Sequence, residues 1–373
     1  MYLAIKELKH GKLRFMMIGI ILVLISWLVF ILSGLGNGLS TLSAASFKNM
    51  DADYVVFEEG SRNSMTRSMF SGDLADELKE FPEVKAVSPM GHSMATVLKG
   101  DTDATEEKTD IAFLAIEPGS FLEPEIIEGH ALSKDRPEDV VINDSFKKEG
   151  FKLGDTLAIE GTTEKVTIVG FTENQTYNHV TSVFTTFDKW RSIHYAAPGS
   201  DNGVNEPVNA IMLQGEDIDL EAINKEFTGY ETVTKSEAVQ GMPGYVEENG
   251  TIMMMLVFLL AISAFVLGVF FYVLTLQKSN QFGIMKAIGA SNGFLGKAIV
   301  SQVFILSFIS IIIGILLTYG TALILPAGMP FELDTKLVII YSIILLIISV
   351  VSSWISVRKI TKIDPLQAIG RAE

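Results

Sequence analysis

Four long stretches of the sequence contain no charged residue, and they constrain the fold more than any other feature. They are residues 15–35, 249–277, 298–325 and 337–357. The apolar core of a bilayer is about 30 Å thick and a helix rises about 1.5 Å per residue, so about 20 apolar residues are needed to cross it. Each stretch is long enough, and the sequence therefore predicts four transmembrane helices.

The charged residues are concentrated between the first two of these stretches. Residues 36–251 contain 17 basic and 39 acidic residues, a net charge of −22, whereas the whole chain carries −15. A segment of about 200 residues is long enough to bury a core of its own. We therefore expect a separate acidic domain over residues 36–248, inserted between the first and second transmembrane helices.

Local patterns within this domain predict a mixture of strands and helices. Residues 53–59 and 109–118 are β-rich and bounded by turn residues, and residues 155–171 predict a hairpin with its turn near Gly161. Residues 71–81 and 219–227 each begin with a residue that favours a helix N-cap and continue with an amphipathic helical pattern. The predicted fold class is a membrane protein with four transmembrane helices and an inserted extracytoplasmic α+β domain.

The distribution of Lys and Arg predicts the orientation, because basic residues near the ends of transmembrane helices are retained in the cytoplasm. The three basic segments are residues 1–14, 278–297 and 358–373. Both termini and the loop over 278–297 are therefore expected in the cytoplasm, and residues 326–336 form a short outer loop. A cleaved signal peptide is the alternative for the first stretch, but its apolar run is longer than the 7 to 15 residues typical of a signal peptide.

Composition also excludes several functional classes. The acidic balance argues against a nucleic-acid partner, and the absence of cysteine excludes disulfides and thiolate metal sites. No phosphate-binding loop and no Ser/His/Asp arrangement is present, and His10, His92, His130 and His194 show no metal-ligand spacing. We therefore expect a chain without enzymatic activity of its own, without an intrinsic cofactor and without a resident metal site.

The loop over 278–297 contains a short basic segment with apolar residues at helical spacing. Phe282, Ile284, Met285 and Ile288 can share one helical face before Gly289 ends the helix. One interpretation is a segment that lies on the membrane surface. The other is a coupling helix that docks into a cytoplasmic partner.

The junction between the domain and the second transmembrane helix carries the side chains with the most distinctive chemistry. Tyr245, Glu248, Met254 and Met255 occur within eleven residues. Heme iron accepts thioether and phenolate ligands, and a carboxylate can bind ferric iron or pair with the macrocycle edge. A helix that begins before Glu248 would place Glu248 and Met255 seven residues apart on one face. The alternative is that these methionines pack against lipid or protein and that Tyr245 anchors the interface.

The order of these segments resembles the FtsX/MacB family of ABC transporter permeases. The resemblance covers almost the whole chain and includes FGIMKAIGAS at 282–291 and KIDPLQAIG at 362–370. Within the family, the chain is most similar to the HrtB-type heme-exporter permeases of Gram-positive bacteria, through MYLAIKELKHGKLRF at the start and MPFEL at 329–333.

This resemblance implies a homodimer in the cell membrane that associates with two copies of a cytoplasmic ATPase and uses ATP hydrolysis there to expel heme. It adds Tyr177 to the candidate heme-binding residues, and His179, two residues later, offers an imidazole that the family does not supply. The alternative within the same family is a permease that exports a peptide or lipid, or that transmits force to a cell-wall hydrolase.

Overall fold

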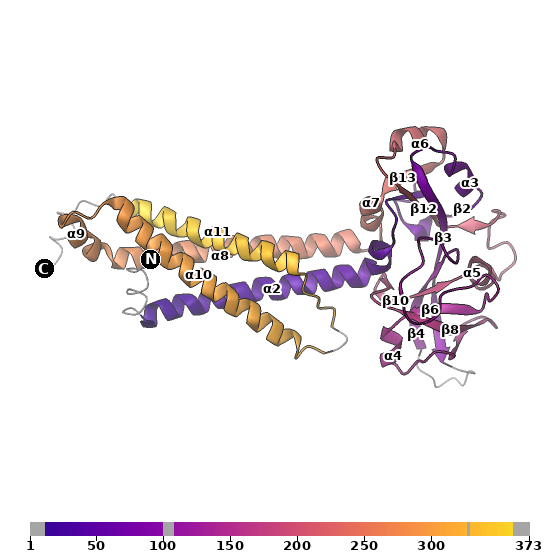
Figure 1. Ribbon diagram of the computed structural model, residues 1–373, viewed down its shortest axis with the longest axis horizontal. Helices are drawn as coiled ribbons and strands as arrows, with labels where there is room; N and C mark the ends of the chain where they lie inside the picture. The colour runs from indigo at the N-terminus through magenta and orange to yellow at the C-terminus, as the bar shows by residue number, and fades with distance from the viewer. Residues whose placement is uncertain (1–11, 100–107, 327–328, 361–373) are drawn as a thin grey trace. The chain divides into compact units, whose positions relative to one another are not determined.

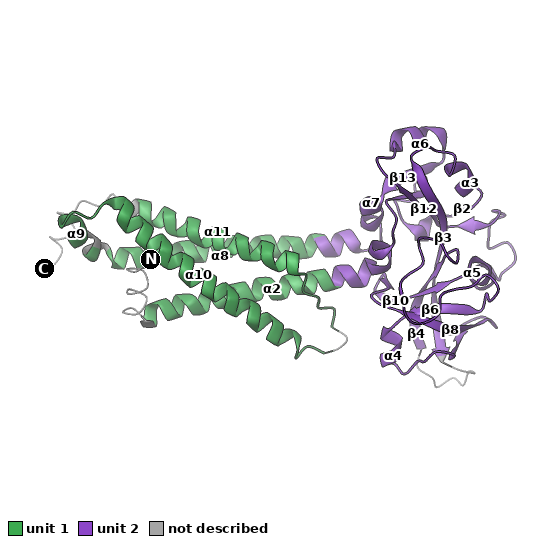
Figure 2. Ribbon diagram, in the orientation of Figure 1, with its two compact units in different colours: residues 1–38, 250–373 green, residues 39–249 purple. Residues whose placement is uncertain are grey.

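The computed structural model describes residues 12–99, 108–326 and 329–360. The chain divides into two compact units, one of residues 1–38 and 250–373 and the other of residues 39–249 (Figure 2). The predicted terminal segments 1–14 and 358–373 lie largely outside the described residues.

The first unit is a bundle of long helices (Figure 1). Four helices are long and apolar enough to cross a membrane: α2 (Lys12–Asn49), α8 (Tyr245–Gln277), α10 (Asn292–Ala322) and α11 (Thr335–Ile360). All four begin before the apolar stretches predicted from the sequence, α8 at Tyr245 for example, and α2 also continues past its stretch to Asn49. The short helix α9 (Ser279–Ala287) follows α8.

Small residues allow the helices of this unit to approach closely. A methyl group on Gly314 of α10 would lie 2.2 Å from the Ser26 hydroxyl of α2, so no larger side chain fits there. The Ser310 hydroxyl donates a hydrogen bond to the Gly19 carbonyl over 3.2 Å. Such contacts matter in a bilayer, where burial of apolar surface does not drive one helix against another.

The described residues of the second unit form a large mixed sheet and five short α-helices. Its path runs β13-β1-β12-β3-β4-β10-β6-β8-β5, and the long strand β3 pairs with β12 through its first half and with β4 through its second. Most pairs are antiparallel, but β10 runs parallel to β4 and β6 runs parallel to β8. The strands are β1 (Tyr54–Glu58), β2 (Phe70–Ser71), β3 (Val84–Lys99), β4 (Lys108–Ala115), β5 (Ile126–Gly129), β6 (Asp139–Asn143), β7 (Thr156–Ile159), β8 (Lys165–Thr172), β9 (Thr176–Tyr177), β10 (Val180–Thr185), β11 (Pro207–Val208), β12 (Ala210–Gly215) and β13 (Tyr230–Thr234).

The short helices of this unit were predicted from the sequence only in part. They are α3 (Leu74–Leu78), α4 (Ser145–Lys148), α5 (Phe187–His194), α6 (Leu220–Glu226) and α7 (Lys235–Gln240), with a 3-10 turn at Met65–Arg67 and the start of α8 in addition. The predicted helices near 71–81 and 219–227 correspond to α3 and α6, and the predicted hairpin is formed by β7 and β8. The fold class predicted from the sequence is therefore confirmed.

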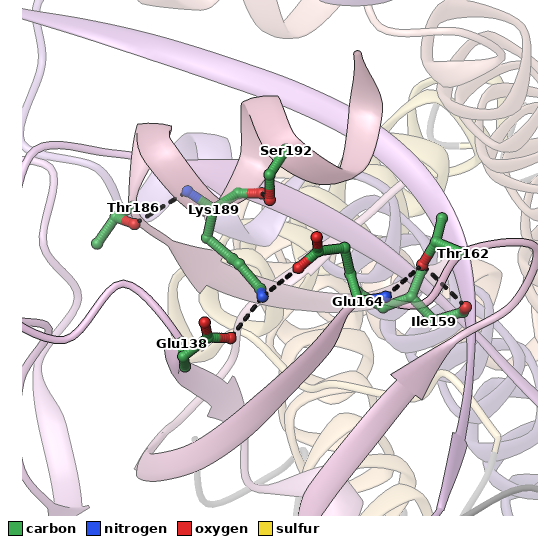
Figure 3. Close-up of polar contacts among 7 residues, drawn as sticks. All are labelled: Glu138, Ile159, Thr162, Glu164, Thr186, Lys189 and Ser192. Carbon is green, nitrogen blue, oxygen red and sulfur yellow. Dashed lines mark hydrogen bonds and ion pairs between the residues drawn. The ribbon is translucent and has the colours of Figure 1, made fainter. Parts of the chain in front are cut away.

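One buried cation ties three segments of the second unit together (Figure 3). The Lys189 side chain on α5 is only 4% exposed, and its ammonium group donates hydrogen bonds of 2.5 Å to both Glu138 and Glu164. Burial alone would lower the pKa of Lys189, but the two carboxylates outweigh it and raise that pKa. Glu138 precedes β6 and Glu164 lies in the β7–β8 turn, so this triad fixes α5 to the sheet.

Candidate functional site

Helix α2 is interrupted at Ala44, inside the second unit. Ala44 has φ −142° and ψ 15°, outside the helical range, and its side chain is fully buried. A break in a helix leaves the carbonyl groups of the preceding turn without their usual partners. The carbonyls of Thr41, Leu42 and Ser43 accept hydrogen bonds from elsewhere.

All three donors come from one β-hairpin. The Thr176 hydroxyl donates to Thr41 over 3.0 Å, His179 N–H to Leu42 over 3.2 Å and Asn178 N–H to Ser43 over 2.8 Å. Tyr177 pairs with Val180, which leaves Asn178 and His179 as a two-residue turn in which both residues have positive φ. The turn between β9 and β10 therefore caps the broken helix.

The His179 side chain lies beside a carboxylate from the first turn of α8. His179 Nε2 is 2.9 Å from Glu248 Oε1, and the Ser43 hydroxyl is 3.0 Å from Glu248 Oε2. The His179 and Glu248 side chains are 35% and 34% exposed, so solvent reaches both. Three elements, α2, the β9–β10 hairpin and α8, thus meet at one carboxylate.

A cation and a phenol lie in the same part of this unit. The Ser40 hydroxyl lies 3.0 Å from the Tyr245 hydroxyl. It also lies 2.5 Å from the Lys48 ammonium group. The ammonium group also lies 5.0 Å from the centroid of the Tyr245 ring, within the range of a cation–π contact. We call Ser40, Ser43, Lys48, His179, Tyr245 and Glu248 the helix-break cluster.

Tyr177 precedes the β9–β10 turn, but its side chain is buried in the core and is not part of the helix-break cluster. Its side chain is 1% exposed and packs against the His92 ring at a centroid distance of 4.5 Å. Burial raises the pKa of the Tyr177 phenol. A ligand cannot reach this phenol in the structure, so the placement does not fit the direct ligand role expected from the sequence, and we leave Tyr177 out of the proposed ligand set.

Met254 and Met255 are exposed on α8, at 53% and 49%. They belong to the first unit, whereas Tyr245 and Glu248 belong to the second. The pairing predicted from the sequence required a helix that begins before Glu248. Helix α8 begins at Tyr245, so Glu248 and Met255 lie seven residues apart on a single helix.

The predicted coupling residues lie on α9 and at its end, and they differ in burial. Ile284 and Ile288 are exposed and four residues apart, whereas Met285 is partly buried against the core of the first unit. Phe282 lies in α9, and its side chain is outside the described part of the structure. The predicted stop at Gly289 is confirmed, because Gly289 follows the last helical turn with φ 98°. The outward apolar surface therefore consists of Ile284 and Ile288 and does not include Met285.

Reading the sequence alone missed Ser40, Ser43 and Lys48. The available signal was the spacing of Ser40, Ser43 and Ser46, which repeats every three residues at the end of an apolar stretch and places polar groups on one helical face. Within the described ranges, no group of three or more His, Asp or Glu side chains is arranged to hold a metal ion.

Comparisons with known proteins place the whole chain. The model of the MacB-like periplasmic core domain matches residues 15–230, and that of the FtsX-like permease C-terminal domain matches residues 253–365. A protein of Staphylococcus epidermidis, provisionally named as the hemin transport system permease protein HrtB, is 27% identical over 99% of both chains. Its namesake in Staphylococcus haemolyticus is 25% identical over the full length of both.

More distant similarities extend beyond these relatives. An uncharacterized ABC transporter permease of Mycobacterium tuberculosis is 24% identical over 99% of both chains. Among solved structures, the extracellular domain of the transporter YknZ from Gram-positive bacteria is 14% identical with a TM-score of 0.35, over 48% of this chain and 99% of that one.

Proposed function

The chain belongs to the FtsX/MacB family of ABC transporter permeases, and on this premise we propose that it is the permease subunit of an exporter that expels heme from the membrane. It is a membrane protein with an extracytoplasmic domain. The full-length similarity to the staphylococcal HrtB proteins supports heme as the cargo.

The observation that carries the proposal is the helix-break cluster at the first turn of α8. Glu248 offers a carboxylate that solvent reaches and that can bind ferric iron, and the His179 imidazole lies 2.9 Å from it. Lys48 supplies a positive charge beside Tyr245, which suits the propionate groups of heme. Met254 and Met255 belong to the first unit, where they are exposed and offer soft ligands of their own.

The energy for export is proposed to come from a partner. The described residues contain no nucleotide-binding loop, and ABC permeases pair with a separate ATPase. We propose a homodimer with two ATPase copies, with both termini and α9 in the cytoplasm of a Gram-positive cell. Ile284 and Ile288 then insert into the ATPase, and α8 carries the movement toward Glu248.

A titration of the purified permease–ATPase complex with hemin in lipid nanodiscs tests the proposal. We expect a saturable shift of the Soret band and ATP-dependent loss of hemin from the membrane. Joint replacement of Met254 and Met255 by leucine keeps volume and apolarity, so stability should fall by less than about 1.5 kcal/mol while hemin affinity and export fall.

The matched control for this experiment is Met253→Leu, which changes another exposed methionine of the same helix. Its hemin affinity should equal that of the wild type. A folded complex that hydrolyses ATP and yet shows no saturable Soret shift would contradict heme as the cargo.

One observation favours the alternative of a peptide cargo. A surface pocket of about 350 Å³ in the second unit is lined by charged residues of both signs, including Asp76, Lys134, Asp188 and Arg191. Such a lining suits a zwitterionic peptide better than a flat apolar macrocycle. Stimulation of the ATPase by peptides, in a complex that hemin leaves unaffected, would favour this function.

A further inference from the structure

We propose that His179 and Ser43 form a hydrogen-bonded lock on the Glu248 carboxylate, which heme must open before its iron can bind that carboxylate. His179 is then a positioning residue that sets the affinity for heme without binding the iron itself. The inference rests on the proposed function and adds to it how the site is held closed.

The contacts to Glu248 occupy both of its oxygens. His179 Nε2 is 2.9 Å from Oε1, and in the tautomer that carries its proton on Nε2 the imidazole donates a hydrogen bond to this oxygen. The Ser43 hydroxyl faces Oε2 at 3.0 Å. Each contact uses one lone pair of its oxygen and draws electron density from the carboxylate, so both contacts weaken Glu248 as an iron ligand.

The hydroxyl of Ser43 has a second acceptor within reach. It lies 2.9 Å from the Leu39 carbonyl, one helical turn back, and its single proton can serve only one acceptor at a time. When iron takes Glu248, Ser43 can turn its proton to Leu39 and remain satisfied. The imidazole of His179 is one-third exposed and can hydrogen-bond to water. The lock therefore opens without leaving a buried polar group unpaired.

The backbone at His179 indicates that its side chain is there for a purpose other than the turn. His179 has φ 67°, in the left-handed region that glycine occupies at least cost in two-residue hairpins. Its N–H is fixed by the Leu42 carbonyl, which aims the imidazole at Glu248. A glycine would adopt this conformation at a lower cost, so the imidazole is present despite a conformational penalty.

The lock also has a mechanical consequence. Glu248 belongs to α8, whereas Ser43 belongs to α2 and His179 to the hairpin that caps the break in α2. Iron binding at Glu248 breaks both contacts of this carboxylate, while the Tyr245 hydroxyl still lies 3.0 Å from the Ser40 hydroxyl of α2. Re-formation of the lock during the ATPase cycle displaces the iron, so occupancy by the cargo and closure of the lock exclude each other.

A double-mutant cycle with hemin as the probe tests the lock in the full-length permease–ATPase complex. His179→Gly suits the backbone and should raise hemin affinity about fivefold, the effect of removing a partly screened hydrogen bond to a charged group. Glu248→Gln should lower the affinity and shift the Soret band. In the Glu248→Gln background, His179→Gly should have no further effect, because the carboxylate it acts through is gone.

The neighbouring variant Asn178→Gly is the matched control, since Asn178 also has positive φ but its side chain is not part of the helix-break cluster. It separates relief of backbone strain from loss of the imidazole, and its hemin affinity should equal that of the wild type. His130→Ala controls for hemin adsorption to an exposed histidine. Thermal unfolding and ATPase assays establish that each variant is folded and assembled.

The outcomes distinguish the two proposals. Absence of hemin binding by the wild type overturns the proposed function and the lock with it. Wild-type binding that weakens in His179→Gly with a displaced Soret band makes His179 an iron ligand and overturns the lock alone. Equal tightening in both backgrounds, or tightening in Asn178→Gly, also overturns the lock while heme export stands.

Discussion

The second unit contains two kinds of polar contact, and they differ in how accessible they are to solvent. In the interior, Lys189 and His92 are both 4% exposed. Lys189 pairs with two carboxylates, whereas Nε2 of His92 has no hydrogen-bond partner among the described residues. At the helix break, His179 and Glu248 are each about one-third exposed. In the interior, the paired Lys189 stabilises the fold and the unpaired His92 limits its stability at low pH. The partly exposed His179 and Glu248 can instead exchange a protein partner for a ligand.

The largest expected effect concerns His92, whose burial and proximity to the charge of His194 lower its pKa from 6.5 to about 4. The unfolded chain binds a proton at this residue below about pH 6.5, whereas the folded domain binds it only near pH 4. Stability should therefore fall by about 3 kcal/mol as the pH drops through this window. Thermal unfolding between pH 7 and 4 measures it.

His92→Phe should remove this acid-dependent loss, because the ring can still pack against Tyr177 and no longer titrates. The exposed His130→Ala is the matched control and should retain the loss. An unchanged pH profile in His92→Phe would show that other groups cause the acid sensitivity.

An intermediate effect is expected at Lys189. Lys189→Ala removes both hydrogen bonds to Glu138 and Glu164, and because these carboxylates are partly exposed we expect a loss of about 2 kcal/mol. The pKa of Lys189 is raised in the folded domain, so its stabilisation should be complete below the pKa of lysine in the unfolded chain. It should be lost at alkaline pH, as the pH rises through the raised pKa of the folded domain. Hemin affinity should not change.

Lys189→Met separates the charge from the packing of the side-chain stem. If the ion pairs stabilise the domain, the methionine variant should unfold at a temperature close to that of the alanine variant. Stability equal to that of the wild type would show that the stem alone is responsible.

The smallest effect on stability is expected at Ser43. Ser43→Ala removes the proton that the Leu39 carbonyl and the Glu248 carboxylate share, and the partly exposed Glu248 can bind water instead. The free energy of unfolding should therefore change by less than about 1 kcal/mol. Denaturant unfolding measures it. A loss as large as that of Lys189→Ala would place the helix break among the interior contacts and erase the distinction between the two regions.

The sequence predicted the architecture well because hydrophobic length is a local property. Four apolar stretches, the turn near Gly161 and the stop at Gly289 could each be recognised within a short window, and the structure confirms them. The extent of α2 could not be read in this way. Its continuation past residue 35 and its break at Ala44 depend on a hairpin about 135 residues later.

The candidate site was predicted only in part for a related reason. Tyr245 and Glu248 were found because they are neighbours in sequence, and His179 was noted beside Tyr177. Ser43 was missed, because it joins them only through tertiary contacts. Tyr177 was expected to face a ligand, but its position in β9 directs the side chain into the core. Met285 similarly packs inward, because helical spacing alone does not say which side of a short helix the protein covers.

The cap on the broken helix restricts how the β9–β10 hairpin can change in length. Surface turns usually accept insertions, because little depends on their register. Here the turn has two residues, and donors at Thr176, Asn178 and His179 meet three successive carbonyls of α2. One added residue would move these donors out of step with the helix, so this turn should tolerate substitution far better than insertion or deletion.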